Sequence, residues 1–187
     1  MQQVDFNVPL DSDKKVTNTQ RIAGAVPTIK YAIEHGAKAV ILMSHLGRPD
    51  GKVQAKYSLK PVVPELEKLL GASVEFAPDC IGKEVEDIVN KASGGQVILL
   101  ENLRFHAEEE GSSKDADGKK VKADKAKVAE FRKGLTALGD IYISKYHLAM
   151  LHSRSLILNK TMLSELHTVL TAPWSALICH KRLPVSS

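Results

Sequence analysis

The sequence has few cysteines and few aromatic residues, and it contains no long apolar run. Its 187 residues include 2 cysteines, and aromatic residues make up 5% of the chain. Cys80 and Cys179 lie far apart, so the sequence predicts neither a zinc motif nor a disulfide framework. Charged and polar residues interrupt the most apolar part of the C-terminal region, namely His152, Arg154, Asn159 and Lys160. We therefore expect no membrane span and no membrane partner.

A strong excess of one charge is also lacking. The chain carries 26 Lys and Arg against 22 Asp and Glu, a net charge of +4. This mild excess is unlike the clustered basic stripe of a nucleic-acid-binding protein, so we expect no nucleic-acid partner. Met1-Gln2-Gln3 leads directly into a predicted strand with no secretory signal, which predicts a cytoplasmic protein. No GxxxxGK[ST] loop is present and no GxGxxG follows a strand, so no nucleotide site is predicted.

What the sequence does contain is an alternation of strand-like and helix-like segments. Ala37 to Met43 is a continuous apolar run, typical of a strand buried on both faces. Strands are predicted at 4–8, 37–43, 73–76, 96–101 and 140–143, and helices at 19–35, 58–71, 83–92 and 124–138. Strands separated by helices require crossover connections. The pattern predicts an α/β fold, a Rossmann-like parallel sheet with helices on both faces.

Polar and cationic side chains follow the predicted strands at their carboxyl ends. These residues are Asp5, Asn7, Ser44, His45, Arg48, Asn102 and Arg104, and Arg21 lies in the first turn of a helix. Ligands of parallel sheets bind beyond the carboxyl ends of the strands. The cationic set therefore predicts a site for a small, strongly anionic molecule.

Each of these residues also has a simpler explanation. Arg48 and His45 could be ordinary loop residues, Asp5 and Asn7 could be turn formers, and Arg21 could be a solvated helix residue. The segment from Glu108 to Lys125 is dense in charge, and we interpret it as a solvated excursion.

Together the segments resemble a known family. The resemblance runs through Val4-Asp5-Phe6-Asn7-Val8-Pro9, Thr19-Gln20-Arg21-Ile22, Ser44-His45-Leu46-Gly47-Arg48-Pro49, Tyr57-Ser58-Leu59-Lys60-Pro61-Val62, Val97 to His106 and Glu108-Glu109-Glu110-Gly111. Residues 4–143 are similar to the amino-terminal domain of phosphoglycerate kinase, especially the fungal enzymes. That family transfers a phosphoryl group between 1,3-bisphosphoglycerate and magnesium ADP, giving 3-phosphoglycerate and ATP.

The resemblance implies roles for individual residues. Arg21 would be catalytic, contacting the phosphoryl group during its transfer. The substrate-binding set would be Val4, Asp5, Phe6, Asn7, Gln20, Arg21, Ser44, His45, Gly47, Arg48, Leu103 and Arg104. The partners would be 3-phosphoglycerate and 1,3-bisphosphoglycerate. The family places magnesium ADP or ATP in a carboxyl-terminal domain, so no cofactor or metal is expected to bind this chain. Members of the family are usually monomeric.

The chain departs from the family pattern at both ends of the resemblance. The family has an arginine where Gln3 stands, so the first strand is clipped, and after Ile143 it continues Asn-Asp-Ala-Phe-Gly-Thr-Ala-His-Arg-Ala-His-Ser-Ser. We expect a domain at 1–143 with its sheet incomplete at both ends, followed by a non-native, disordered tail at 144–187. Suitable codons for Met162 to Ala176, read one nucleotide earlier, spell Asp-Ala-Phe-Gly-Thr-Ala-His-Arg-Ala-His-Ser-Ser-Met-Val-Gly. This shifted reading predicts a retained intron between Ser144 and Lys160 and a frameshift after it.

Two hypotheses remain for the chain itself. In the first, it is a phosphoglycerate kinase fragment that keeps part of the substrate site but cannot turn over. In the second, it is a non-catalytic product of a mis-spliced gene, either inert or acting only through interactions.

Overall fold

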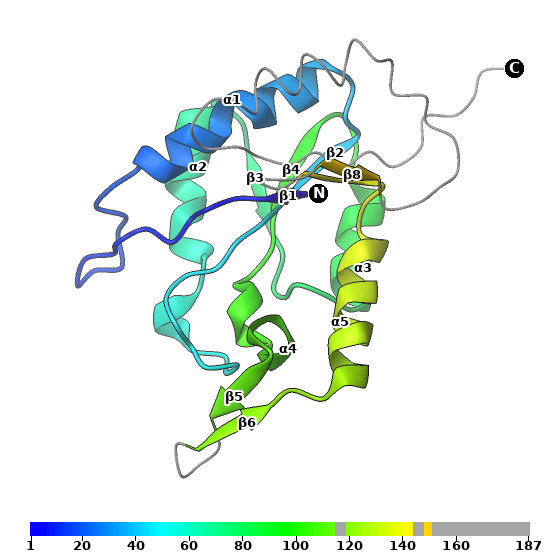
Figure 1. Ribbon diagram of the computed structural model, residues 1–187. Coiled ribbons are helices and arrows are strands. Elements are labelled where there is room, and N and C mark those ends of the chain that lie inside the picture. Colours follow the sequence, from blue (N-terminus) through cyan, green and yellow to red (C-terminus); the bar gives the residue numbers. More distant parts are fainter. Residues whose placement is uncertain (115–118, 144–147, 151–187) are drawn as a thin grey trace, which may run out of the picture.

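The computed structural model describes residues 1–114, 119–143 and 148–150, and its centre is a mostly parallel sheet (Figure 1). The strand order is β3-β4-β2-β1-β7-β8. The strands are β1 (Gln2–Gln3), β2 (Ala39–Met43), β3 (Val74–Phe76), β4 (Gln96–Leu99), β7 (Ile141–Ile143) and β8 (Leu148–Met150). Neighbours from β3 to β7 pair in parallel, whereas β8 pairs with β7 in the antiparallel sense. The predicted parallel sheet is thus confirmed.

Helices cover both faces of this sheet, as the sequence predicts. Helices α1 (Gln20–Glu34) and α2 (Val63–Leu70) lie on one face, and α3 (Lys83–Lys91) and α5 (Lys125–Ala137) on the other (Figure 1). Every residue of β2 is buried. Ile22 and Ile29 of α1 and Val85 of α3 are completely buried. The apolar core therefore has two layers, one on each side of β2 and its neighbours.

The predicted strand at 4–8 is wrong. Only Gln2 and Gln3 pair in the sheet as β1, and the chain leaves it after Val4, whose N–H donates to the Met43 carbonyl at 2.9 Å. Val4, Phe6 and Val8 are buried while Asn7 is exposed. The alternation that predicted a strand is real, but it comes from an extended loop with one buried side and not from a hydrogen-bonded ladder.

Two other segments differ from their predictions. The helix expected at 58–71 is shorter, because the 3₁₀ turn Lys60–Val62 precedes α2; another 3₁₀ turn, Ala55–Tyr57, comes before the expected helix. Pro61 and Pro64 have no N–H to donate, which delays the regular helix. The segment from Glu108 to Lys125 contains the short helix α4 (Ala107–Glu110) and the hairpin of β5 (Ser112–Lys114) and β6 (Lys120–Lys122). The predicted solvation is confirmed for β6, which is exposed throughout, and is wrong for Glu108, Glu110, Ser112 and Ser113, which are half-buried.

Near the start of the chain, a polar side chain is buried without a hydrogen-bond partner among the described residues. Gln2 is completely buried between β2 and β7, and neither of its amide atoms has a hydrogen-bond partner among the described residues. The amino group of Met1 donates to the Ile141 carbonyl at 2.7 Å, which ties the start of the chain to β7.

The predicted disordered tail at 144–187 lies outside the described residues apart from β8. In the described part of the chain, no helix has the length and apolar character needed to cross a membrane.

Candidate functional site

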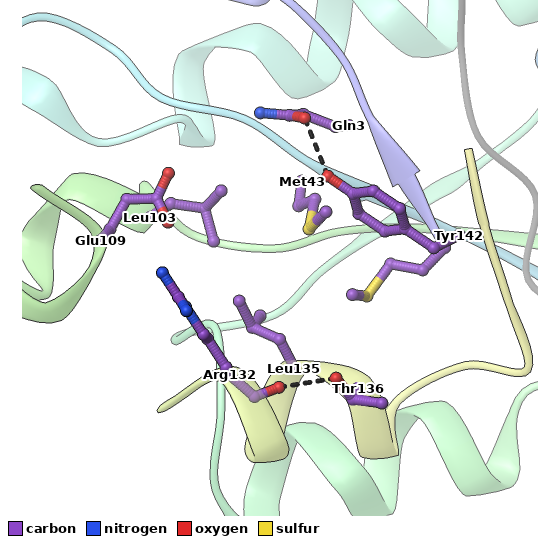
Figure 2. Close-up of a pocket in the computed structure, with 9 residues that line it drawn as sticks. Gln3, Met43, Leu103, Glu109, Arg132, Leu135, Thr136 and Tyr142 are labelled. Atoms are coloured by element: carbon purple, nitrogen blue, oxygen red, sulfur yellow. Dashed lines mark hydrogen bonds between the residues drawn. The ribbon is translucent and has the colours of Figure 1, made fainter. Parts of the chain in front are cut away.

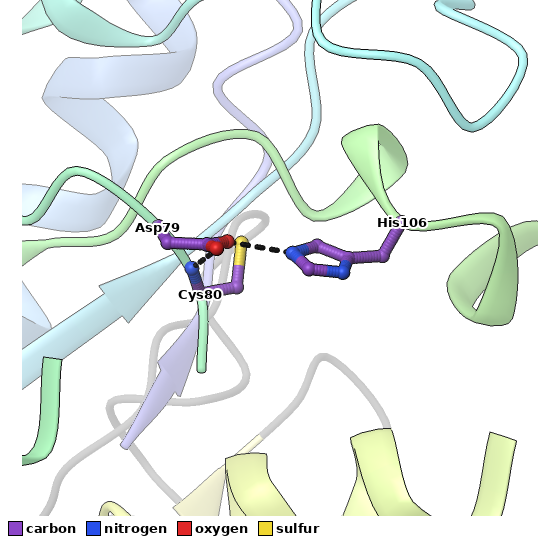
Figure 3. Close-up of side chains that lie close together, drawn as sticks. All are labelled: Asp79, Cys80 and His106. Carbon is purple, nitrogen blue, oxygen red and sulfur yellow. Dashed lines mark hydrogen bonds and ion pairs between the residues drawn. The ribbon is translucent and has the colours of Figure 1, made fainter. Parts of the chain in front are cut away.

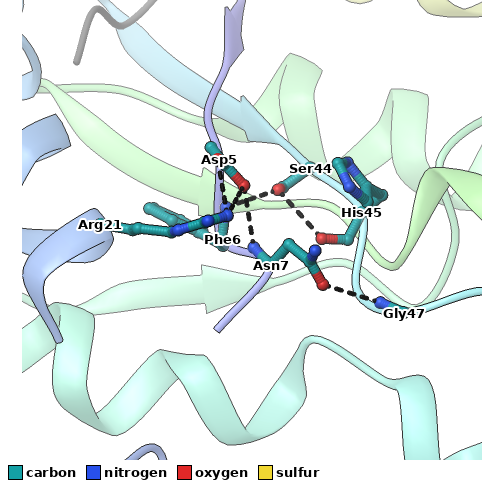
Figure 4. A network of polar contacts seen from close by, with 7 residues as sticks. All are labelled: Asp5, Phe6, Asn7, Arg21, Ser44, His45 and Gly47. Atoms are coloured by element: carbon teal, nitrogen blue, oxygen red, sulfur yellow. Dashed lines mark hydrogen bonds and ion pairs between the residues drawn. The ribbon is translucent and has the colours of Figure 1, made fainter. Parts of the chain in front are cut away.

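Several of the predicted site residues lie together where the chain leaves β1 and β2 (Figure 4). The buried hydroxyl of Ser44 accepts a hydrogen bond from the Phe6 N–H at 2.8 Å. The Asn7 side-chain oxygen accepts one from the Gly47 N–H at 3.0 Å. These bonds join the loop after β1 to the loop after β2, at the carboxyl edge of the sheet where a ligand is expected.

An ion pair between Asp5 and Arg21 lies at the open side of these loops. One terminal nitrogen of Arg21, Nη1, donates to both carboxylate oxygens of Asp5, at 2.8 and 2.7 Å. Asn18 accepts from the Gln20 N–H at 2.9 Å, which fixes the start of α1 and so places Arg21 in its first turn. The two charged side chains are 42% and 40% exposed. Because exposed pairs contribute little free energy, an incoming anion can compete with Asp5 for the guanidinium.

Arg104 approaches the same loops from the end of β4. Its Nη1 donates to the Gly47 carbonyl at 2.9 Å, and its Nε lies 3.4 Å from a Glu110 carboxylate oxygen. Arg104 belongs to a 3₁₀ turn, Leu103–Phe105. The guanidinium is therefore held beside Gly47 with other donors left to turn toward a ligand.

Gly47 is the residue that lets these groups come together. Its φ of +63° is in the left-handed region, and a Cβ built there would lie 2.5 Å from two ring carbons of Tyr57. A side chain at this position would be strained and would collide with the ring. The glycine is thus required by the geometry of the loop.

His45 is half-buried beside the cationic residues. Burial lowers the pKa of its imidazole, and the positive charge of Arg104 lowers it further, against an opposing effect of Asp5. Because the pKa lies below the ordinary value of 6.5, the imidazole ring is neutral at physiological pH. In the free protein His45 is therefore a neutral hydrogen-bonding group.

The structure brings together most, but not all, of the predicted substrate-binding residues. Hydrogen bonds connect Asp5, Asn7, Arg21, Gly47 and Arg104. The Ser44 hydroxyl bonds to the Phe6 N–H and the His45 carbonyl, and the positive charges of Arg104 and Arg21 act on the His45 ring. The side chains of Val4, Phe6 and Leu103 are buried, so these residues can reach a ligand only through their backbone. Gln20 and Arg48 are exposed, and neither side chain has a hydrogen bond to the other site residues in the described part of the chain.

Two further residues support these loops: Asn102, which the sequence places at the carboxyl end of a strand, and Glu101, which was not predicted to belong to the site. Asn102 is completely buried; its side-chain NH₂ donates to the Leu46 and Tyr57 carbonyls at 2.7 and 2.8 Å, and its oxygen accepts from the Arg104 N–H at 3.0 Å. The Glu101 carboxylate accepts from the Ser58 hydroxyl at 2.7 Å and from the Leu59 N–H at 2.8 Å. Both residues directly follow a buried strand, which is a signal for function, but their partners are distant in sequence.

A cavity of about 310 Å³ lies between α5 and the sheet (Figure 2). Its lining residues are Met1, Gln3, Met43, Leu103, Glu109, Arg132, Leu135, Thr136 and Tyr142. Burial raises the pKa of Glu109, while Arg104 and Arg132 oppose that rise. Of the predicted site residues, the cavity touches Leu103, so it lies beside the cationic loops and not among them.

The metal-binding side chains that come together in the described residues do not suit magnesium. The set there that could hold a cation is Asp79, Cys80 and His106. Magnesium prefers oxygen ligands, whereas this set offers a thiol and an imidazole. We therefore assign no nucleotide or magnesium ligand in the described part of the chain.

Comparisons with known proteins agree on one family. The sequence model of the family described as phosphoglycerate kinase matches residues 1–156. Phosphoglycerate kinases of Aspergillus flavus and Neurospora crassa are 82% and 79% identical to the chain over 141 residues, which is 75% of this chain and 34% of each relative. The crystal structure of phosphoglycerate kinase from Pyrococcus horikoshii OT3 superimposes with a TM-score of 0.57 at 31% identity, covering 73% of this chain and 31% of that one. The chain thus spans about a third of the length of the curated relatives it matches.

Proposed function

Because this chain belongs to the phosphoglycerate kinase family, we propose that its cationic loops bind 3-phosphoglycerate and 1,3-bisphosphoglycerate. One observation carries the proposal. The Asp5–Arg21 pair, Asn7, and the Gly47–Arg104 contact converge at the carboxyl edge of the parallel sheet. These groups suit a small molecule with a hydroxyl, a carboxylate and a phosphate.

The proposed roles follow from the chemistry of each side chain. Asp5 and Asn7 hold the hydroxyl and carboxylate end of the glycerate, since one accepts and the other both donates and accepts. His45, Arg48 and Arg104 attract its anionic groups. Arg21 exchanges Asp5 for the phosphoryl oxygens, because a planar guanidinium offers several donors to charge that is spread over equatorial oxygens. Phosphoryl transfer depends on such positioning and charge neutralisation more than on covalent help from the protein.

We further propose that this chain alone does not turn over. The family uses a magnesium nucleotide, the sequence motifs for a nucleotide site are not found in this chain, and the chain spans about a third of the length of its relatives. The alternative is a non-catalytic product that is inert or acts only through interactions. Monomeric state and cytoplasmic location are likewise proposed from family membership. A coupled assay with purified chain tests the inactivity, because ATP formation above background contradicts it.

Calorimetric titration with 3-phosphoglycerate tests the binding site. We expect saturable, salt-sensitive binding, since exposed charges supply much of the attraction. Arg21→Ala and Arg104→Ala should each weaken it by about 1.5–3 kcal/mol, the range for a hydrogen bond to a charged group. Lys30→Ala is the matched control, because it removes an exposed cation from the same helix as Arg21.

The control should bind like the parent protein. If Lys30→Ala weakens binding as much as Arg21→Ala, the attraction is only general charge and the assigned site is wrong. If Arg21→Ala and Arg104→Ala bind as well as the parent, the site assignment is wrong. If the folded parent does not bind, the non-catalytic alternative is favoured.

A further inference from the structure

Three side chains with different metal-binding groups meet away from the loops described above (Figure 3). Asp79 and Cys80 lie between β3 and α3, and His106 follows the 3₁₀ turn Leu103–Phe105. One carboxylate oxygen of Asp79, the Cys80 sulfur and a ring nitrogen of His106 all lie within 4.8 Å of one another. The Asp79 oxygen is 2.6 Å from His106 Nε2.

We propose that Asp79, Cys80 and His106 form a binding site for a zinc ion. Thiolate, imidazole and carboxylate are the three ligand types that zinc takes in proteins, with bonds of about 2.0–2.3 Å. Ligand atoms around a tetrahedral ion of that size are about 3–4 Å apart. A small outward shift of Asp79 from His106 would admit the ion. Water would complete the fourth position.

The surroundings hold the cluster in place and leave it a route to solvent. Cys80 is completely buried, and its thiol donates to the Glu101 carbonyl at 3.0 Å. The His106 ring packs against Phe131 with centroids 4.8 Å apart. The side chains of His106 and Asp79 are 23% and 52% exposed. An ion can therefore enter past Asp79 and reach the sulfur from the solvent side.

The charges beside the cluster favour a dication. Burial raises the pKa of the Cys80 thiol well above its usual range, and the negative charges of Asp79, Glu101 and Glu109 raise it further. Burial also raises the pKa of Asp79, but the hydrogen bonds from His106 and the Cys80 N–H outweigh that effect, and the net pKa is lowered. When zinc binds, the thiol proton leaves to solvent and the sulfur–metal bond forms in its place. The same carboxylates that oppose a bare thiolate then stabilise the bound cation.

Cobalt(II) is the probe for the test, because a cobalt–thiolate bond gives a near-ultraviolet charge-transfer band and zinc gives none. Added to the full reduced chain, Co²⁺ should produce this band, and Zn²⁺ should abolish it by competition. Cys80→Ser should lose the band, and His106→Asn should lose it or need at least about tenfold more Co²⁺, as expected when a metal site is disturbed.

Matched controls separate this site from general metal binding. Cys179→Ser removes the other cysteine of the chain, and His35→Asn removes an exposed histidine on a different helix end. Both should retain the band at unchanged Co²⁺ concentration. In thermal melts, Zn²⁺ should raise the Tm of the parent and of both controls but not of His106→Asn. Because His106→Asn keeps the buried cysteine, it tests the site even if Cys80→Ser does not fold. The proposal is overturned if the folded parent gives no band, or if the band follows Cys179 instead of Cys80.

Discussion

At the scale of single residues, Gln2 is a polar side chain in an apolar position. Its amide is completely buried in β1 and neither amide atom is paired among the described residues. We expect Gln2→Leu to raise the free energy of unfolding by about 1–3 kcal/mol, the cost of burying an unpaired polar group. Urea denaturation measures the change.

The adjacent residue provides the control for this substitution. Gln3 is exposed and accepts a hydrogen bond from the Tyr142 hydroxyl at 2.9 Å. Gln3→Leu should therefore not stabilise the protein. An equal gain from both substitutions would mean that general apolar character, and not relief of a buried amide, is responsible.

His45 makes a separate prediction about pH. Burial and Arg104 hold its pKa below 6.5 in the free protein, whereas a bound anion would favour the charged ring and raise that pKa. Binding of 3-phosphoglycerate should therefore take up protons, and affinity should rise as pH falls from about 8 toward 6. Calorimetry in two buffers of different ionisation enthalpy measures the uptake.

The ligand phosphate also titrates in this range, so the comparison must be between variants. His45→Asn should lose the part of the proton uptake that belongs to the imidazole, and the exposed His35→Asn should keep it. Equal uptake by the parent and His45→Asn would place the proton on the ligand and not on His45.

At the scale of elements, the Asn102 side chain joins three segments by hydrogen bonds. Its side chain bonds to the Leu46 and Tyr57 carbonyls and to the Arg104 N–H. Asn102→Ala would leave these buried groups unpaired, so we expect a loss of at least about 2 kcal/mol of unfolding free energy and weaker binding through Arg104. Asn90→Ala, an exposed position on α3, should change stability little. Urea denaturation of the two variants makes the comparison, and similar losses would contradict the role of Asn102.

The elements also show what could be predicted from sequence. β2 and β4 were predicted because continuous apolar runs are typical of strands buried on both faces. The carboxyl-edge location of Asp5, Ser44 and Arg104 followed from the parallel topology. The strand at 4–8 was wrong because alternation reports burial of one side and not hydrogen bonding. The role of Asn102 could not be predicted, because its partners Leu46 and Tyr57 are 56 and 45 residues away.

At the scale of the whole molecule, the family match and the C-terminal sequence lead to a prediction about the gene. The curated relatives match over 141 residues of the chain, and the shifted reading of Met162 to Ala176 restores the family motif. We expect a spliced transcript in which the Ile143 codon is followed by codons for Asn-Asp-Ala-Phe-Gly-Thr. Sequencing of transcripts across this region tests it, and genomic DNA whose codons do not spell the shifted reading would rule it out.

The position of β1 has a consequence for how the chain reaches its native state. β1 is first in the sequence but lies between β2 and β7, and the Met1 amino group bonds to Ile141, 140 residues away. Closing so long a loop costs entropy before the contact returns any free energy, which slows folding. During synthesis from the N-terminus, β3, β4 and β2 can pair early, whereas one edge of β1 stays open until β7 leaves the ribosome. The pairing of β1 with β7 should therefore be a late step of folding.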